Sequence, residues 1–161
     1  PLGWPPWGPP FVAITLGRET SMLIQVRHCR GLVGHVRSSM SQLARVTVKL
    51  RSGAAMPIFG LGTWAMAAKD ECTNACAAAL AAGYRLLDTA TMYENEAEVG
   101  AALAASGVAR DEVFVVSKLK GGDHGAEAPR DALDLSLAKL RLDHLDLWLM
   151  HSPAGADVVA T

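Results

Sequence analysis

The strongest constraint on the fold is an alternation of short apolar segments with helix-forming segments from residue 46 onward. Residues 46–50 and 56–60 flank the turn-forming pair Ser52 and Gly53, which predicts a β-hairpin. Strands are then predicted at 59–64, 84–90, 113–119 and 145–151, and helices at 70–82, 94–106 and 129–142. Because consecutive strand–helix units form parallel sheets with right-handed crossovers, the sequence predicts an α/β fold.

Two architectures are built from such units: an open doubly wound sheet, and the first half of a (β/α)8 barrel. Doubly wound nucleotide-binding domains carry a third glycine and begin a helix directly after the glycine-rich turn. The segment Gly60–Trp64 has one G-x-G pair, no third glycine and no immediate helix. This pattern weakens the doubly wound alternative but leaves both architectures open.

The composition argues against several classes of protein. Of the 161 residues, 50% are hydrophobic and 19% are charged, which is typical of a folded domain. The formal net charge of −1 gives no reason to expect nucleic acid or a membrane surface as a partner, and no apolar run reaches the roughly 18 residues of a membrane span. Cys29, Cys72 and Cys76 lack the spacing of a metal site, so we expect packing residues in a reducing compartment and no metal.

The first 45 residues differ in composition from the rest. Residues 1–10 form a Pro/Gly/Trp tract that cannot be helical, and residues 11–45 hold five arginines against one acid, Glu19. Such Arg-rich, Ser-rich segments are typical of organelle transit peptides, and translated GC-rich non-coding DNA looks similar. We therefore expect an unstructured or targeting-like flank at 1–45 and one domain at 46–161. The expected location is the cytoplasm, or an organelle if the flank is a transit peptide.

Polar residues follow each predicted parallel strand. In both architectures these strand ends meet at one face, where loops carry the chemistry. Taken singly, each residue has a structural alternative: a helix cap for Asp88, a rim residue for Tyr93, a solvated Lys118 and a structural His151. Their coincidence at one face favours a functional site. In chain order, the residues at the strand ends are Gly62, Thr63, Trp64, Asp88, Tyr93, Lys118 and His151.

These side chains suit carbonyl chemistry. A phenol such as that of Tyr93 is a weak acid at neutral pH, and a nearby ammonium, here that of Lys118, stabilises its phenolate. A carboxylate beside the ammonium keeps it charged and in place, and a histidine can donate a hydrogen bond to a substrate carbonyl. The set holds no activated serine or cysteine and no three-ligand metal cluster. It therefore suits reversible carbonyl reduction with the hydride brought by a cofactor.

Three segments resemble the aldo-keto reductase superfamily. GYRLLDTATMYENEAEVG at 83–100 is similar to a signature of that family, and MPIFGLGTW and SLAKLRLDHLDLWLMHSP resemble its first strand and its third helix with fourth strand. The resemblance covers about residues 46–153. The segment KLKGGDHG is more similar to bacterial members of the diketogluconate-reductase type.

The resemblance implies a (β/α)8 TIM barrel that binds NADP(H) and reduces aldehydes, ketones or keto-sugars. By matching positions, Tyr93 is the general acid, Asp88 and Lys118 tune it, and His151 orients the carbonyl. Gly62, Thr63, Trp64 and Asp88 are then expected at the cofactor, and Trp64, Tyr93 and His151 at the substrate.

A complete (β/α)8 barrel typically needs about 250 residues, and this chain supplies about four strand–helix units after its hairpin. We therefore expect a truncated N-terminal half of such a barrel, with reduced or no activity. Exposed edges of the half-barrel predict self-association. The alternative is a non-catalytic half-barrel that acts as an interaction or regulatory protein.

Overall fold

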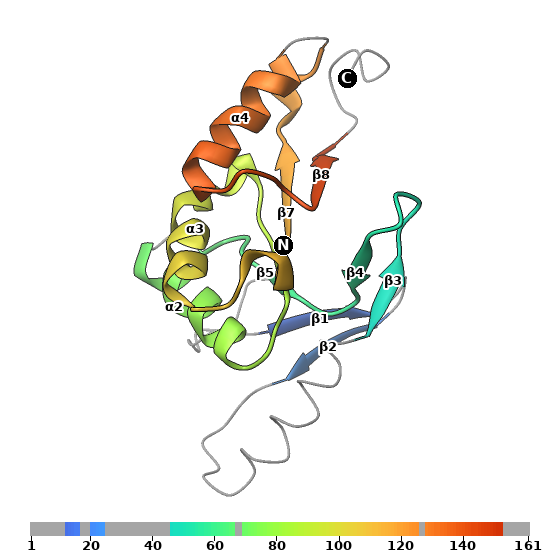
Figure 1. Ribbon diagram of the computed structural model, residues 1–161, viewed down its shortest axis with the longest axis vertical. Helices are drawn as coiled ribbons and strands as arrows, with labels where there is room; N and C mark the ends of the chain where they lie inside the picture. Colours follow the sequence, from blue (N-terminus) through green and yellow to red (C-terminus); the bar gives the residue numbers. More distant parts are fainter. Residues whose placement is uncertain (1–11, 17–19, 25–45, 67–68, 126–127, 153–161) are drawn as a thin grey trace, which may run out of the picture.

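The computed structural model describes residues 12–16, 20–24, 46–66, 69–125 and 128–152. The centre of the fold is a four-stranded parallel sheet in the order β5-β6-β7-β8 (Figure 1). Its strands are β5 (Leu61–Gly62), β6 (Leu86–Asp88), β7 (Phe114–Leu119) and β8 (Leu147–Met150). Strand order and direction confirm the prediction of consecutive strand–helix units.

Three helices connect the strands: α2 (Lys69–Ala81), α3 (Glu96–Ala105) and α4 (Ala128–Leu140). Short 3-10 turns stand before them or before a strand: η2 (Thr91–Tyr93), η3 (Arg110–Glu112) and η4 (Gly121–Asp123). In Figure 1 the three helices lie side by side along one face of the sheet. Doubly wound sheets carry helices on both faces, so the described residues fit the barrel architecture. None of the helices in these ranges is long and apolar enough to cross a membrane.

The predicted hairpin ahead of the sheet is confirmed. β3 (Thr47–Lys49) pairs antiparallel with β4 (Ala55–Pro57). The turn between them has Gly53 at φ +94°, a backbone angle that only glycine adopts freely. Gly53 N donates to Leu50 O at 2.9 Å and closes the turn.

A second hairpin lies in the flank and was not expected. β1 (Val12–Leu16) and β2 (Thr20–Ile24) pair antiparallel, with Val12 opposite Ile24 and Leu16 opposite Thr20. Both strands contain β-branched residues, and Gly17 stands between them in the sequence, which favours a hairpin. The expectation of a flank without secondary structure is therefore wrong for these two strands. The rest of residues 1–45 lies outside the described ranges, and the domain boundary stays a prediction.

The core lies between the sheet and the helices. β7 is buried along most of its length, as its nearly continuous apolar sequence predicts. Cys72 and Cys76 on α2 are both buried and free, which confirms them as packing residues, whereas Cys29 lies outside the described residues. The Tyr84 ring packs on Phe59 with 4.6 Å between ring centres, and burial raises the pKa of Tyr84. Other core side chains are those of Leu80, Leu87, Val99, Leu103, Val113, Val115 and Leu140.

Gly100 of α3 lies directly against the end of α4. A Cβ atom at this position would overlap the backbone of Leu140, the last residue of α4. Only a residue without a side chain permits this packing, so Gly100 sets the distance between the two helices.

We expect Gly100→Ala to lower the free energy of unfolding by about 1–3 kcal/mol, because the methyl group must push the two helices apart. Gly122→Ala is the matched control, since a Cβ atom there meets nothing within 4 Å. Its effect should stay within about 0.5 kcal/mol. Urea unfolding followed by circular dichroism measures both variants. Equal stability of the two would contradict the close approach.

Candidate active site

The site lies where the parallel strands end. Asp88 is the last residue of β6, and Lys118 lies on the neighbouring strand two residues beyond Val116, which pairs with Asp88. Because side chains alternate along a strand, Val116 and Lys118 point to one face and Ser117 points to the other. His151 directly follows β8, and its backbone N–H donates to Leu119 O at 2.9 Å, which extends the ladder between β7 and β8.

The Lys118 ammonium is the centre of the site. Its Nζ lies 2.5 Å from Asp88 Oδ1, 3.0 Å from Thr89 O and 3.3 Å from the Tyr93 hydroxyl. An ammonium has three protons to donate, so these partners occupy all of them. The Lys118 side chain is 15% exposed and that of Asp88 is 33% exposed. Asp88 therefore faces solvent in part while it holds the lysine in place.

Tyr93 and His151 complete the cluster. Their rings meet edge to face, with 5.7 Å between centres and 88° between planes. Within the part of the chain that the structure describes, the buried Nδ1 of His151 has no hydrogen-bond partner. The structure therefore brings together all four side chains that the sequence singled out. Their catalytic roles stay a prediction.

The residues after β5 divide between two environments. Gly62 pairs with Asp88 in the sheet register, and a Cβ atom there would meet nothing within 4 Å. Trp64 is 70% exposed. Thr63 is fully buried, and its Oγ1 lies 3.2 Å from both Asp88 O and Asn95 Oδ1, so the one hydroxyl proton is shared between these two acceptors. The Thr63 side chain thus turns into the protein behind the strand end, and the expected contact of Thr63 with the cofactor stays a prediction.

Asn95 is a buried residue that the sequence reasoning missed. It is 3% exposed and bonds to the segments that follow β5 and β6. In the sequence, an asparagine at the start of a helix reads as an ordinary N-cap. The sequence offers one hint of a role for Asn95, namely its position two residues after Tyr93. That position alone does not reveal hydrogen bonds to distant loops.

Cys72, one of the two cysteines of α2, contacts the backbone of Asn95. The Cys72 thiol donates to Asn95 O at 4.0 Å. The hydrogen bond between the two thiols lowers the pKa of Cys72 and raises that of Cys76 well above its usual range. A buried thiol with a raised pKa is unreactive, which agrees with a packing role for Cys76.

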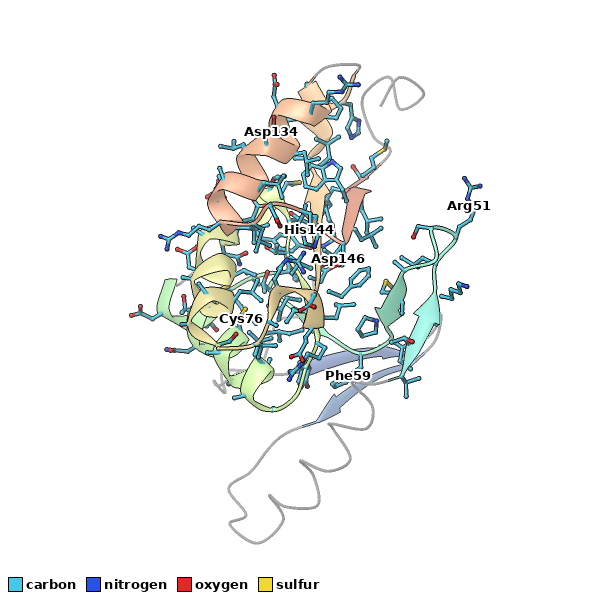
Figure 2. All side chains as sticks on the ribbon, in the orientation of Figure 1. Arg51, Phe59, Cys76, Asp134, His144 and Asp146 are labelled. Atoms are coloured by element: carbon cyan, nitrogen blue, oxygen red, sulfur yellow. The ribbon has the colours of Figure 1, made fainter. Side chains whose placement is uncertain are left out.

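At the opposite end of the sheet, an ion pair joins the segments that precede β7 and β8. Arg110 donates to Asp146 Oδ2 at 2.7 Å and to His144 O at 3.0 Å, and Val115 N donates to the same Asp146 oxygen at 2.8 Å. Figure 2 labels His144 and Asp146 in the segment between α4 and β8. A hydrogen bond to His144 lowers the pKa of Asp143. His144 thus lies on the face that supports stability, away from the cluster around Lys118.

A cavity of about 330 Å³ lies beside the site. None of Asp88, Tyr93, Lys118 and His151 lines it. Its walls come from η2, η4 and α4, and its lining residues are Thr91, Met92, Glu94, Lys120, Asp123, Ala132, Leu135 and Lys139.

The sequence model of the Aldo/keto reductase family matches residues 58–159, which is more than half of the chain. The chain therefore belongs to the aldo/keto reductase family, an oxidoreductase family, and the predicted membership is confirmed. Methylglyoxal reductase DkgA of Salmonella typhimurium is 50% identical over 109 residues, which cover 68% of this chain and 38% of that protein. Glyoxal reductase of Bacillus subtilis is 47% identical over 107 residues, which cover 66% and 39%.

Solved structures agree with this assignment. An aldo/keto reductase from Brucella melitensis matches with a TM-score of 0.66 at 45% identity, over 69% of this chain and 42% of that one. MGS-M4, an aldo-keto reductase from a Medee basin deep-sea metagenome library, matches with 0.65 at 46% identity, over 68% and 40%. The chain spans about two fifths of the length of these relatives. The four parallel strands with helices on one face are accordingly part of a TIM-barrel fold.

A double-mutant cycle measures how strongly Lys118 and Asp88 are coupled. We expect Lys118→Met and Asp88→Asn to show a coupling free energy of unfolding of about 1 kcal/mol, because the two charges are in contact and the lysine is only 15% exposed. The control is Lys120→Met with Asp123→Asn, a pair at 3.6 Å whose lysine is 51% exposed. Its coupling should be at most about 0.5 kcal/mol and should vanish in high salt. Equal coupling in the two cycles would argue against a fixed ammonium in the site.

Proposed function

We propose that this chain carries the proton-donating site of an NADP(H)-dependent reductase of small aldehydes and ketones. The observation that carries the proposal is the Lys118 ammonium, which contacts both the Asp88 carboxylate and the Tyr93 hydroxyl. A positive charge beside a phenol stabilises the phenolate that forms when the phenol gives up its proton.

The residues around the site fit a reduced nicotinamide. Trp64 presents an exposed flat ring, and the open Cα side of Gly62 lets a planar group approach the backbone. Asp88 is part-exposed and can accept a hydrogen bond from a sugar hydroxyl. Gly62, Trp64 and Asp88 would hold this end of the cofactor, with Thr63 supporting Asp88 from behind. When bound, NADPH supplies the hydride for carbonyl reduction.

The chain's own groups handle the proton. As the carbonyl carbon gains a hydride, its oxygen becomes negative, and the Tyr93 hydroxyl donates its proton to that oxygen to give the alcohol. Lys118 stabilises the phenolate that remains, and Asp88 keeps the ammonium in place. His151, edge-on to Tyr93, donates an N–H to the same oxygen and so holds the carbonyl beside the phenol. Water then returns a proton to Tyr93.

We further propose 2-oxoaldehydes as the substrate class. Support comes from the two bacterial relatives that are named as reductases of methylglyoxal and glyoxal. The two free cysteines of the described core suit the reducing conditions of the cytoplasm, the compartment that this proposal implies.

One observation favours a second candidate function. β8 ends in Leu149 and Met150, which are 39% and 36% exposed, and its one strand partner among the described residues is β7. An apolar strand edge of this kind can pair with another chain. The second proposal is therefore a non-catalytic protein that associates with a second copy of itself through β8.

The test compares the two tyrosines of the chain. We expect Tyr93→Phe to lower kcat/KM for NADPH-dependent reduction of methylglyoxal by at least about 100-fold, because the variant lacks the proton donor. Binding of NADPH, followed by its fluorescence, should change little. Tyr84→Phe is the matched control, since Tyr84 is buried against Phe59 away from the site, and its activity should stay near that of the wild type.

Two outcomes would contradict the reductase proposal. In one, Tyr93→Phe retains the activity of the control variant. In the other, the unmodified protein sediments as a dimer and binds no NADPH in the fluorescence assay, which would favour the second candidate.

A further inference from the structure

We infer that Asn95 and its neighbour Glu96 are positioning residues that fix the strand ends carrying Asp88 and Lys118. The inference rests on the proposed function, because that function makes these strand ends part of an active site. Both residues stand at the start of α3 and touch segments from three different strands.

Asn95 uses its whole side-chain amide on other segments. Its Oδ1 accepts from Thr63 Oγ1 at 3.2 Å and from Thr89 Oγ1 at 3.0 Å. Its Nδ2 donates to Thr63 O at 2.8 Å and to Met66 O at 3.3 Å. An asparagine amide offers two donor protons and two acceptor sites, so these four bonds satisfy it fully at 3% exposure.

Both threonines lead directly to the site. Thr63 N and Thr63 Oγ1 donate to the backbone oxygen of Asp88 at 2.9 and 3.2 Å. Thr89 O accepts from Lys118 Nζ at 3.0 Å. Asn95 is thus separated from Asp88 and from Lys118 by one threonine in each case.

Asn95 also restrains Tyr93. Glu94 stands between Tyr93 and Asn95, and its backbone has the left-handed angles φ 56° and ψ 23°. A non-glycine residue rarely adopts this conformation unless its surroundings hold it. The bonds of Asn95 on one side and the bond from Tyr93 N to Ala90 O at 3.0 Å on the other supply that hold.

Glu96 connects the start of α3 to a third strand, β7. It is 1% exposed, and its Oε1 accepts from Ser117 Oγ at 2.7 Å. Ser117 directly precedes Lys118 and points to the helix face of β7 while Lys118 points to the site. Lys139 Nζ lies 3.8 Å from Glu96 Oε2 and partly balances the buried charge.

An ordinary cap does not explain this arrangement. Asparagine at a helix N-cap normally accepts from a backbone N–H in the first turn of its own helix. The Asn95 side chain makes no such bond, and its acceptor is committed to Thr63 and Thr89. The residue therefore connects loops rather than stabilising α3.

The test removes one hydroxyl from the network and reads the environment of Lys118. Thr89→Val keeps the shape of the side chain but loses the bond to Asn95, and Thr89→Ser keeps the hydroxyl. Acetylation of each lysine by a water-soluble acylating reagent is followed by mass spectrometry on the full chain. Lys120, which is 51% exposed, serves as the internal reference.

We expect Thr89→Val to raise the acetylation rate of Lys118 relative to Lys120 about fivefold, the factor that corresponds to one hydrogen bond of ordinary net strength. Thr89→Ser should restore the wild-type ratio. Ser106→Ala, which removes a bond to Leu103 O at the other end of α3, should leave the ratio unchanged even if the protein melts earlier. Should Thr89→Val not fold, Thr63→Val and Thr63→Ser give the same comparison for the other hydroxyl.

Three results would overturn the inference. They are an unchanged ratio in a folded Thr89→Val protein, an equal rise in the Val and Ser variants, or an equal rise in Ser106→Ala. Because acetylation needs no turnover, the two ideas fail separately: equal activity of Tyr93→Phe and Tyr84→Phe together with the expected acetylation pattern would refute the proposed function alone.

Discussion

The ion pair between Lys118 and Asp88 is the interaction on which the site depends. A lysine that is 15% exposed is costly to bury unless a carboxylate and further acceptors surround it. The parallel register of β6 and β7 supplies the carboxylate, since it places Asp88 opposite Val116, two residues before Lys118 on the same face. Thr89 O and the Tyr93 hydroxyl complete the shell. The positive charge beside the Tyr93 hydroxyl is therefore kept in place by the sheet itself.

The start of α3 extends this constraint to the helix layer. Asn95 and Glu96 are almost fully buried, and polar groups in such positions destabilise a fold unless they find partners. Their partners are Thr63, Thr89 and Ser117, each next to a strand end that forms the site. Bonds to the whole Asn95 amide and to Glu96 Oε1 offset part of this cost and also fix the strand ends next to Lys118, whereas the buried Glu96 Oε2 has only Lys139 Nζ at 3.8 Å. Helix α3 also packs against α4 at Gly100. The same helix therefore contributes both to the packing of the helix layer and to the geometry of the site.

Much of the fold and of the site could be predicted from the sequence because both follow from short-range patterns. Apolar strands alternate with helices of the right length, and the polar residues at the ends of β6, β7 and β8 are visible as interruptions of apolar runs. The inward turn of Thr63 and the network of Asn95 could not be predicted, since they depend on hydrogen bonds between loops distant in sequence. The β1–β2 hairpin was missed for another reason: the Arg-rich composition of the flank outweighed two short runs with β-forming residues.

In solution, the Lys118 ammonium should stay in contact with Asp88 and Tyr93. The most direct measurement is nitrogen-15 NMR of the lysine side-chain ammonium groups at low temperature, with Lys118→Met to assign the Lys118 signal. We expect a distinct, slowly exchanging Lys118 signal with a nuclear Overhauser contact to the Tyr93 ring, because Nζ lies 4.9 Å from the ring centre. A Lys118 signal that coincides with those of the solvent-exposed lysines, with no contact to Tyr93, would contradict it.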